Sequence, residues 1–249
     1  MSFCFSHSDK IFFEADIFAK EVAELYRLDK QKSEVVPVGV DLNFIDQLFK
    51  NGAPHINRRQ LGLKDDDIIL MTVNRLAADK GVDKIVLALS QLVKEYPQMK
   101  LLVIGQGYQE KEILNLIEEK GLKHHVCHLK NIPEKELYFY YRLADIYLSV
   151  FSFLGSSISS LEAMACSLPL ITTAQPWLVK DGRNGLVIND NNPATIQAAI
   201  TNLIKQNKLK VMGQESRRIV QEFDWDSIAA NAVTKYEKLL NQRMSYEKI

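Results

Sequence analysis

From Ile68 onward, short apolar runs alternate with segments of helical periodicity, and this alternation continues through most of the chain. The apolar runs predict strands at residues 68–73, 101–104, 125–129, 145–150, 168–172 and 186–188. The segments between them predict helices at 83–96, 109–120 and 133–143, and another that starts near Ile158. Short apolar strands that alternate with amphipathic helices indicate βαβ units and a parallel sheet covered on both faces. The sequence therefore predicts an α/β fold with a doubly wound parallel sheet.

The segments on either side of this alternation are mainly helical. Before it, the pattern predicts a helix at 15–28, a short strand at 34–41 that runs into a turn, and two short helices between 42 and 63. After it, helices are predicted at 193–205, 209–223 and 225–243. These last helices form a tail whose apolar face must pack against another part of the protein.

Composition excludes several classes of protein. Lys plus Arg and Asp plus Glu each total 31, which argues against a dedicated nucleic-acid binder, because such a protein needs a basic surface. No apolar run approaches the roughly 18 residues of a membrane-spanning helix, and the N-terminus lacks the pattern of a signal peptide. Three widely spaced cysteines are typical of reduced thiols. We expect a cytoplasmic protein, and peripheral attachment to the cytoplasmic face of a membrane stays open.

The stretch from Leu148 to Thr173 contains the most informative turn. An apolar strand leads into Gly155, Ser156 and Ser157, and a helix follows. The first amides of a helix have no partner within it, so a turn of small residues there can bind a phosphate or a sugar. Glu162 is the single acid of this helix and could accept hydrogen bonds from a ribose diol. The alternative is an ordinary helix start with a capped first turn.

Two further loops follow predicted strands, at the sheet edge where doubly wound folds bind ligands. The loop after the first strand of the alternation carries Arg75 and Lys80, a pair of cations that can hold a diphosphate. An ordinary solvated loop would also accommodate them. The next loop carries Gly105 and Gly107 but lacks the third glycine of a dinucleotide fingerprint. These glycines fit either a tight turn or the close approach of a ligand to the backbone.

Two other clusters do not have the spacing that their chemistry requires. The residues His124, His125, Cys127 and His128 surround the start of a strand and do not match a zinc motif. The serines at 156, 157, 159 and 160 lack the Gly-x-Ser-x-Gly elbow of a serine hydrolase.

Taken together and in order, these elements resemble the C-terminal half of a family-4 retaining glycosyltransferase (glycosyltransferase group 1) with the GT-B architecture. The segments that carry the resemblance are VPVGVD at 36–41, NRLAADKG at 74–81, VIGQG at 103–107, LEAMACSLPLITT at 161–173, DGRNGLV at 181–187 and FDW at 223–225. The resemblance implies three parts: a remnant of the N-terminal acceptor domain with its linker at 1–41, a Rossmann-like domain that binds a nucleotide sugar at 42–223, and a C-terminal helix at 224–249. It also implies a role in carbohydrate or glycan biosynthesis.

The resemblance also implies a role for each candidate residue. Arg75 and Lys80 would hold the diphosphate and stabilise the leaving nucleotide, Glu162 would hold the ribose, and these three form the catalytic set. The other donor-binding positions are Gly105, Gly107, Asn131, Ile132, Leu154, Gly155, Ser156, Ser157 and Leu161, with Asn131 and Ile132 beside the base. No metal or other cofactor is expected, because the two cations supply the positive charge.

Three departures from the family pattern leave two functions open. Leu154 occupies the position of the first of two glutamates spaced eight apart, the loop at 174–177 is short, and only 1–32 resembles the acceptor domain. One hypothesis is a donor-binding half of a hexosyltransferase that works with an acceptor domain, either in a partner protein or in a missing N-terminal domain. The other is a non-catalytic nucleotide-sugar-binding or regulatory subunit. A sugar-nucleotide epimerase of related fold is a third reading, although it would also need a second domain.

Overall fold

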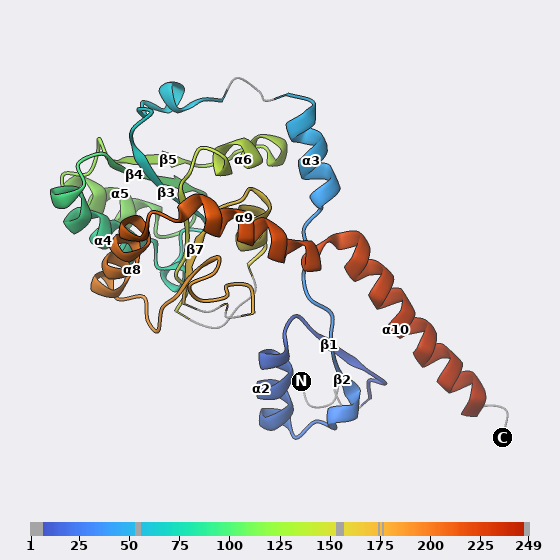
Figure 1. Ribbon diagram of the computed structural model, residues 1–249. Coiled ribbons are helices and arrows are strands. Elements are labelled where there is room, and N and C mark those ends of the chain that lie inside the picture. Colours follow the sequence, from blue (N-terminus) through green and yellow to red (C-terminus); the bar gives the residue numbers. More distant parts are fainter. Residues whose placement is uncertain (1–6, 53–55, 153–156, 174, 176, 247–249) are drawn as a thin grey trace. The chain divides into compact units, whose positions relative to one another are not determined.

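The structure is a computed structural model and describes residues 7–52, 56–152, 157–173, 175 and 177–246 (Figure 1). Tertiary contacts divide the chain into two compact units. One unit is Asn43–Gln221, and the other combines the described parts of Met1–Leu42 and Glu222–Ile249. In the described residues, no helix is both long enough and apolar enough to cross a membrane.

The larger unit is built on a six-stranded sheet in which every neighbouring pair of strands is parallel. The strands are β3 (Ile68–Val73), β4 (Met99–Ile104), β5 (Val126–Leu129), β6 (Ile146–Ser149), β7 (Leu170–Thr172) and β8 (Gly185–Val187). Their order across the sheet is β5-β4-β3-β6-β7-β8, so the chain runs outward from β3 in one direction and then outward from β6 in the other. This reversal of direction between β3 and β6 is the switch point at which doubly wound folds bind ligands.

Helices cover both faces of this sheet. The helices are α3 (Leu42–Lys50), α4 (Val82–Glu95), α5 (Glu110–Glu119), α6 (Glu134–Tyr141), α7 (Ile158–Ala165), α8 (Pro193–Gln206) and α9 (Leu209–Ile219). Residues of α4, α5 and α8 share one core with Leu70, Leu101 and Leu148 of the strands. On β6, the neighbouring Tyr147 points to the opposite face and packs on Tyr141 of α6, with ring centroids 5.7 Å apart. Both faces are therefore buried, and the predicted doubly wound α/β fold is confirmed.

Local sequence explains where several of these helices begin and end. The Asn192 side chain accepts the Ala194 N–H at 3.0 Å, and Pro193 opens α8, where a missing N–H costs nothing. A shorter 3-10 helix, η2 (Arg58–Leu61), starts with a capping box between Asn57 and Gln60. At the C-terminal end, the predicted helix at 209–223 is divided, because α9 gives way to the 3-10 helix η4 (Val220–Phe223).

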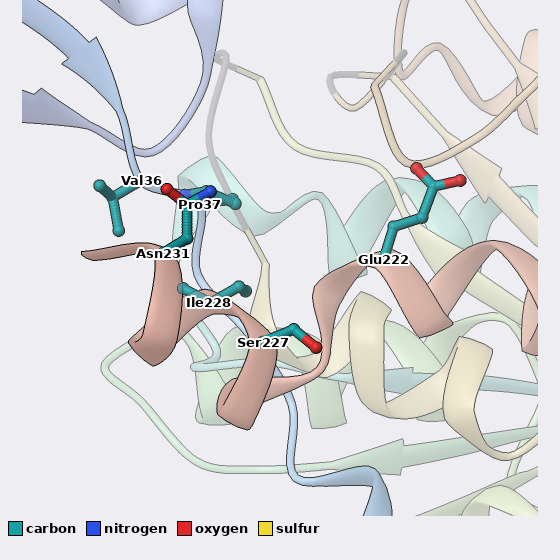
Figure 2. Close-up of a pocket in the computed structure, with 6 residues that line it drawn as sticks. All are labelled: Val36, Pro37, Glu222, Ser227, Ile228 and Asn231. Atoms are coloured by element: carbon teal, nitrogen blue, oxygen red, sulfur yellow. The ribbon is translucent and has the colours of Figure 1, made fainter. Parts of the chain in front are cut away.

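The smaller unit contains a parallel pair of strands, β1 (Ile11–Phe13) and β2 (Ser33–Val35), connected through α2 (Asp16–Tyr26) and the short 3-10 helix η1 (Lys30–Lys32). The long helix α10 (Trp225–Tyr246) belongs to this unit. Glu34 of β2 accepts from Lys10 at 2.9 Å and from Lys235 of α10 at 2.7 Å. A pocket of about 160 Å³ lies in this unit, as Figure 2 shows, and is lined by Val36, Pro37, Glu222, Ser227, Ile228 and Asn231.

Candidate functional site

The loop between β3 and α4 carries the two predicted cations and is fastened to the loop after β4. The Leu76 N–H donates to the Gln106 carbonyl at 3.0 Å, and the Gln109 N–H donates to the Leu76 carbonyl at 3.1 Å. The Tyr108 hydroxyl accepts the Ala78 N–H at 3.1 Å, at the start of the 3-10 helix η3 (Ala78–Lys80). These bonds hold the loop at the carboxyl end of the sheet before any ligand arrives.

The two glycines after β4 allow this close contact between loops. A Cβ atom on Gly105 would lie 2.0 Å from the Asn74 carbonyl oxygen, and one on Gly107 would lie 2.2 Å from the Leu76 carbonyl oxygen. Gly105 also has a φ of +133°, which other residues rarely adopt. The close packing of the two loops therefore explains why glycine stands at both positions, in agreement with the alternative of a tight turn. Their contact with a donor stays a prediction.

Lys80 has a well-defined environment, whereas Arg75 is exposed. The Lys80 ammonium lies 4.2 Å from the centroid of the Phe151 ring and 3.4 Å from Asp79 Oδ2. Phe151 follows β6, so this cation–π contact joins the β3 loop to the β6 loop. The Ser152 N–H adds a second link by donating to the Asp79 carbonyl at 3.0 Å. The two loops at the switch point are thus connected through the residues around Lys80.

Glu162 lies in α7, and its carboxylate faces two tyrosines of α6. The Tyr141 hydroxyl donates to Oε2 at 2.8 Å, and the Tyr138 hydroxyl lies 3.4 Å from Oε1. Burial raises the pKa of Glu162 above its usual value, and the Tyr141 hydrogen bond opposes this shift. The charge of Glu134 adds to the rise in pKa. The lone acid of this helix is therefore a half-buried group with hydrogen-bond partners of its own.

The start of α7 is only partly described. The Ser157 Oγ accepts the Ser160 N–H at 3.2 Å and lies 2.8 Å from the Ser159 Oγ, so Ser157 acts as the N-cap. Leu161 is fully buried inside the fold. The predicted positions Leu154, Gly155 and Ser156, and the loop positions 174 and 176, lie outside the described residues. For Ser157 the capped first turn is confirmed, while its contact with a sugar or phosphate stays a prediction.

The predicted base-binding turn follows β5, beside the Gly105 loop. Asn131 is exposed and Ile132 is half-buried. The Gly105 N–H donates to the Leu129 carbonyl at 2.8 Å, which brings this turn next to the β4 loop. Contact of Asn131 and Ile132 with a base stays a prediction.

The histidines near β5 bind backbone carbonyls. His125 Nδ1 lies 2.9 Å from the Met99 carbonyl oxygen, and His128 Nε2 lies 2.8 Å from the Gly105 carbonyl oxygen. Within the described part of the chain, no group of three His, Cys, Asp or Glu side chains is arranged to hold a metal ion.

Sequence reasoning missed the side chains that contact the predicted residues. Phe151 beneath Lys80, Tyr108 beside Ala78, and Tyr138 and Tyr141 beside Glu162 were not among the candidates. The only signal was the run Tyr138-Phe139-Tyr140-Tyr141, which does not show which ring faces α7.

Relatives of known name span most of this chain. It is 26% identical over 243 residues to D-inositol 3-phosphate glycosyltransferase of Segniliparus rotundus, covering 94% of this chain and 53% of that protein. It is also 26% identical over 251 residues to spore coat protein SA of Bacillus subtilis, covering 94% of this chain and 66% of that protein. The chain therefore spans only between half and two thirds of the length of these relatives.

Solved structures share the fold at lower sequence identity. Anabaena HepE in complex with UDP has a TM-score of 0.81 at 19% identity, covering 94% of this chain and 65% of that one. Sucrose-phosphate synthase from Thermosynechococcus elongatus has a TM-score of 0.81 at 23% identity, covering 97% of this chain and 61% of that one. A structure described as the GtfA/B complex has a TM-score of 0.74 at 18% identity, covering 96% of this chain and 47% of that one. These likenesses confirm the predicted Rossmann-like, GT-B type of fold.

A family model described as "Glycosyl transferases group 1" matches residues 55–219, which is more than half of the chain. The matched range contains the β3 loop, the β4 glycines and the whole of α7. The chain therefore belongs to the group 1 family of glycosyl transferases, as its motifs predicted.

Proposed function

We propose that this chain binds a nucleoside-diphosphate sugar and acts as the donor-binding half of a retaining hexosyltransferase. The acceptor would be held by a second half, either in the rest of a longer chain or in a separate subunit. The lengths of the relatives support a second half, since the chain matches only 53% of one and 66% of the other. The description of one structural neighbour as a complex agrees with a separate subunit.

One observation carries the proposal. The Arg75–Lys80 loop follows β3, the helix of Glu162 follows β6, and these two strands are paired neighbours at the switch point of the sheet. The loop with the two cations and the segment that leads into the helix of the acid therefore start at the same edge of the sheet. In the proposed reaction the cations stabilise the negative charge that develops on the leaving diphosphate. A metal ion is not required for this step, because Arg75 and Lys80 provide the charge.

Calorimetry and thermal shift with UDP, GDP, ADP and their sugars test the proposal. Ligand at about 100 times its dissociation constant should stabilise the protein by about 2.7 kcal/mol. Lys80→Ala should weaken binding of the selected nucleotide about tenfold or more, since a hydrogen bond to a charged group contributes about 1.5–3 kcal/mol. Lys94→Ala is the matched control, because Lys94 is an exposed lysine at the far end of α4. Absence of any selective nucleotide in a folded sample would refute the proposal.

The second candidate is a non-catalytic subunit that binds a nucleotide sugar and regulates a partner. It is favoured by Leu154, whose side chain cannot accept a hydrogen bond where the family has a glutamate. Both candidates predict nucleotide binding. They differ in turnover. When this chain is mixed with the purified second half, nucleotide should be released from the sugar donor only if the first candidate is right.

A further inference from the structure

Two tyrosines of α6 each contact a different oxygen of the Glu162 carboxylate. Tyr138 and Tyr141 are three residues apart, so they lie on the same face of the helix. Tyr141 donates to Oε2 at 2.8 Å, and Tyr138 reaches Oε1 at 3.4 Å. Each oxygen of the carboxylate thus has its own hydroxyl donor.

Aromatic packing immobilises both tyrosine rings. Tyr141 is fully buried, with its ring centroid 5.7 Å from that of Tyr147 and 6.4 Å from that of Tyr138. Tyr138 packs edge-on against Phe44 of α3, with centroids 6.0 Å apart. Because a tyrosine hydroxyl is carried by a rigid ring, fixing the ring also fixes the hydroxyl.

The chemistry of these groups determines the direction of each hydrogen bond. Burial raises the pKa of both Tyr138 and Tyr141, so their hydroxyls stay protonated and donate to the carboxylate. An ionised carboxylate has about four acceptor positions. With two of these occupied by the tyrosines, the other two remain for a ligand that offers a pair of hydroxyls.

We infer that Tyr138 and Tyr141 are positioning residues, which hold the Glu162 carboxylate in the orientation that accepts the 2′- and 3′-hydroxyls of a bound nucleotide. This inference rests on the proposed donor site. The competing explanation is that the tyrosines only compensate the burial of an acid, in which case they would affect stability but not the choice of ligand.

Calorimetry with three probes separates these explanations. UDP offers the ribose diol, 2′,3′-dideoxy-UDP lacks it, and inorganic pyrophosphate offers only the charge. Tyr141→Phe should lower UDP affinity about tenfold and leave the affinities for dideoxy-UDP and pyrophosphate within about twofold, since only one hydrogen-bonded partner is lost. Tyr138→Phe should have a smaller effect, because its contact with Glu162 is longer.

Tyr140→Phe is the matched control. Tyr140 is a buried tyrosine of the same helix, and the two hydroxyls beside Glu162 are those of its neighbours Tyr138 and Tyr141. Its substitution should leave all three affinities unchanged. An equal loss for all three probes in Tyr141→Phe, or no loss for any, would overturn the inference.

A second measurement keeps the inference testable if the parent protein binds no UDP. The groups that face Glu162 are Tyr138, Tyr141 and Glu134 of α6, Tyr147 of β6, and Cys166 at the end of α7. The Tyr141 hydrogen bond lowers the pKa of Glu162, so Tyr141→Phe should raise that pKa in a titration followed by carbon-13 NMR of labelled glutamate. A parent that binds none of UDP, GDP and ADP refutes the proposed function, whereas an unchanged Glu162 pKa in Tyr141→Phe refutes the positioning role.

Discussion

Gly107→Ala should destabilise the larger unit and displace the loop that carries Arg75 and Lys80. A Cβ atom at position 107 would lie 2.2 Å from the Leu76 carbonyl oxygen, 2.7 Å from its carbon and 2.8 Å from its nitrogen. All three are backbone atoms, so no side chain can rotate away. The φ of Gly107 is not positive, and the cost is therefore steric rather than conformational.

The magnitude follows from the contacts that must change. Overpacking a close contact costs about 1–3 kcal/mol. Moving Leu76 also strains its two backbone hydrogen bonds, to Gln106 and from Gln109, which contribute about 0.5–1.5 kcal/mol each. The expected loss is about 4 kcal/mol, a large part of the 5–15 kcal/mol that stabilises a typical protein.

Urea unfolding followed by circular dichroism measures this loss. Gly121→Ala is the matched control: nothing lies within 4 Å of its added Cβ, and its φ of +69° should cost only about 1–2 kcal/mol. In the folded fraction of Gly107→Ala, pyrophosphate affinity should fall as well, because the Lys80 loop has moved. If Gly107→Ala were no less stable than Gly121→Ala, the reasoning on the packing of the two loops would be wrong.

Three further substitutions test other parts of the structure. Phe151→Leu should weaken pyrophosphate binding about threefold in calorimetry, because a partly exposed cation–π contact contributes about 0.5–1 kcal/mol, whereas Phe139→Leu on α6 should not. Glu34→Gln should lower the free energy of unfolding at pH 7 by about 1 kcal/mol, since two partly exposed ion pairs are lost. The Lys235 and Lys10 ammonium groups lower the pKa of Glu34 from 4.5 to about 2, so its contribution is present above about pH 4.5 and is lost as the pH falls towards 2. Thermal unfolding of parent and variant across this range should therefore converge at low pH. Glu24→Gln, which removes an exposed acid of α2, is the control and should change the free energy of unfolding at pH 7 by less than about 0.5 kcal/mol. Leu154→Glu should raise donor turnover in the presence of the second half if the residue replaces a lost catalytic contact, and unchanged turnover would count against that role.

The sheet could be predicted because its strands are buried on both faces. Residues such as Leu70 and Leu148 contact helices, while their neighbours Met71 and Tyr147 face the opposite side, so the whole run is apolar. The strand β1 did not stand out in the same way. It is three residues long, all half-buried, and it pairs with β2 across an intervening helix. Its apolar run, Ile11 to Phe13, is too short for its pattern alone to predict a strand.

The positions of the site loops could be predicted, but their contacts could not. Parallel strands bring their carboxyl ends to one edge, so Arg75, Gly105 and Glu162 were expected in the same region because each lies in a segment that follows a predicted strand. The contacts depend on side-chain directions across helices that are distant in sequence. Glu162 reaches Tyr141 over a separation of 21 residues, and nothing in either local pattern indicates that pairing.

The described contacts explain how the site could be arranged before a ligand binds. The β3 and β4 loops are joined by backbone hydrogen bonds, and the β3 and β6 loops are joined through Lys80, Phe151 and Ser152. The Glu162 carboxylate accepts hydrogen bonds from the Tyr141 and Tyr138 hydroxyls. Groups that are held in place beforehand need little reordering on binding, and they stabilise developing charge without the cost of reorganisation. If the proposed function is right, a substitution that loosens one of these contacts should therefore weaken the nucleotide site even though it removes no group that touches the ligand.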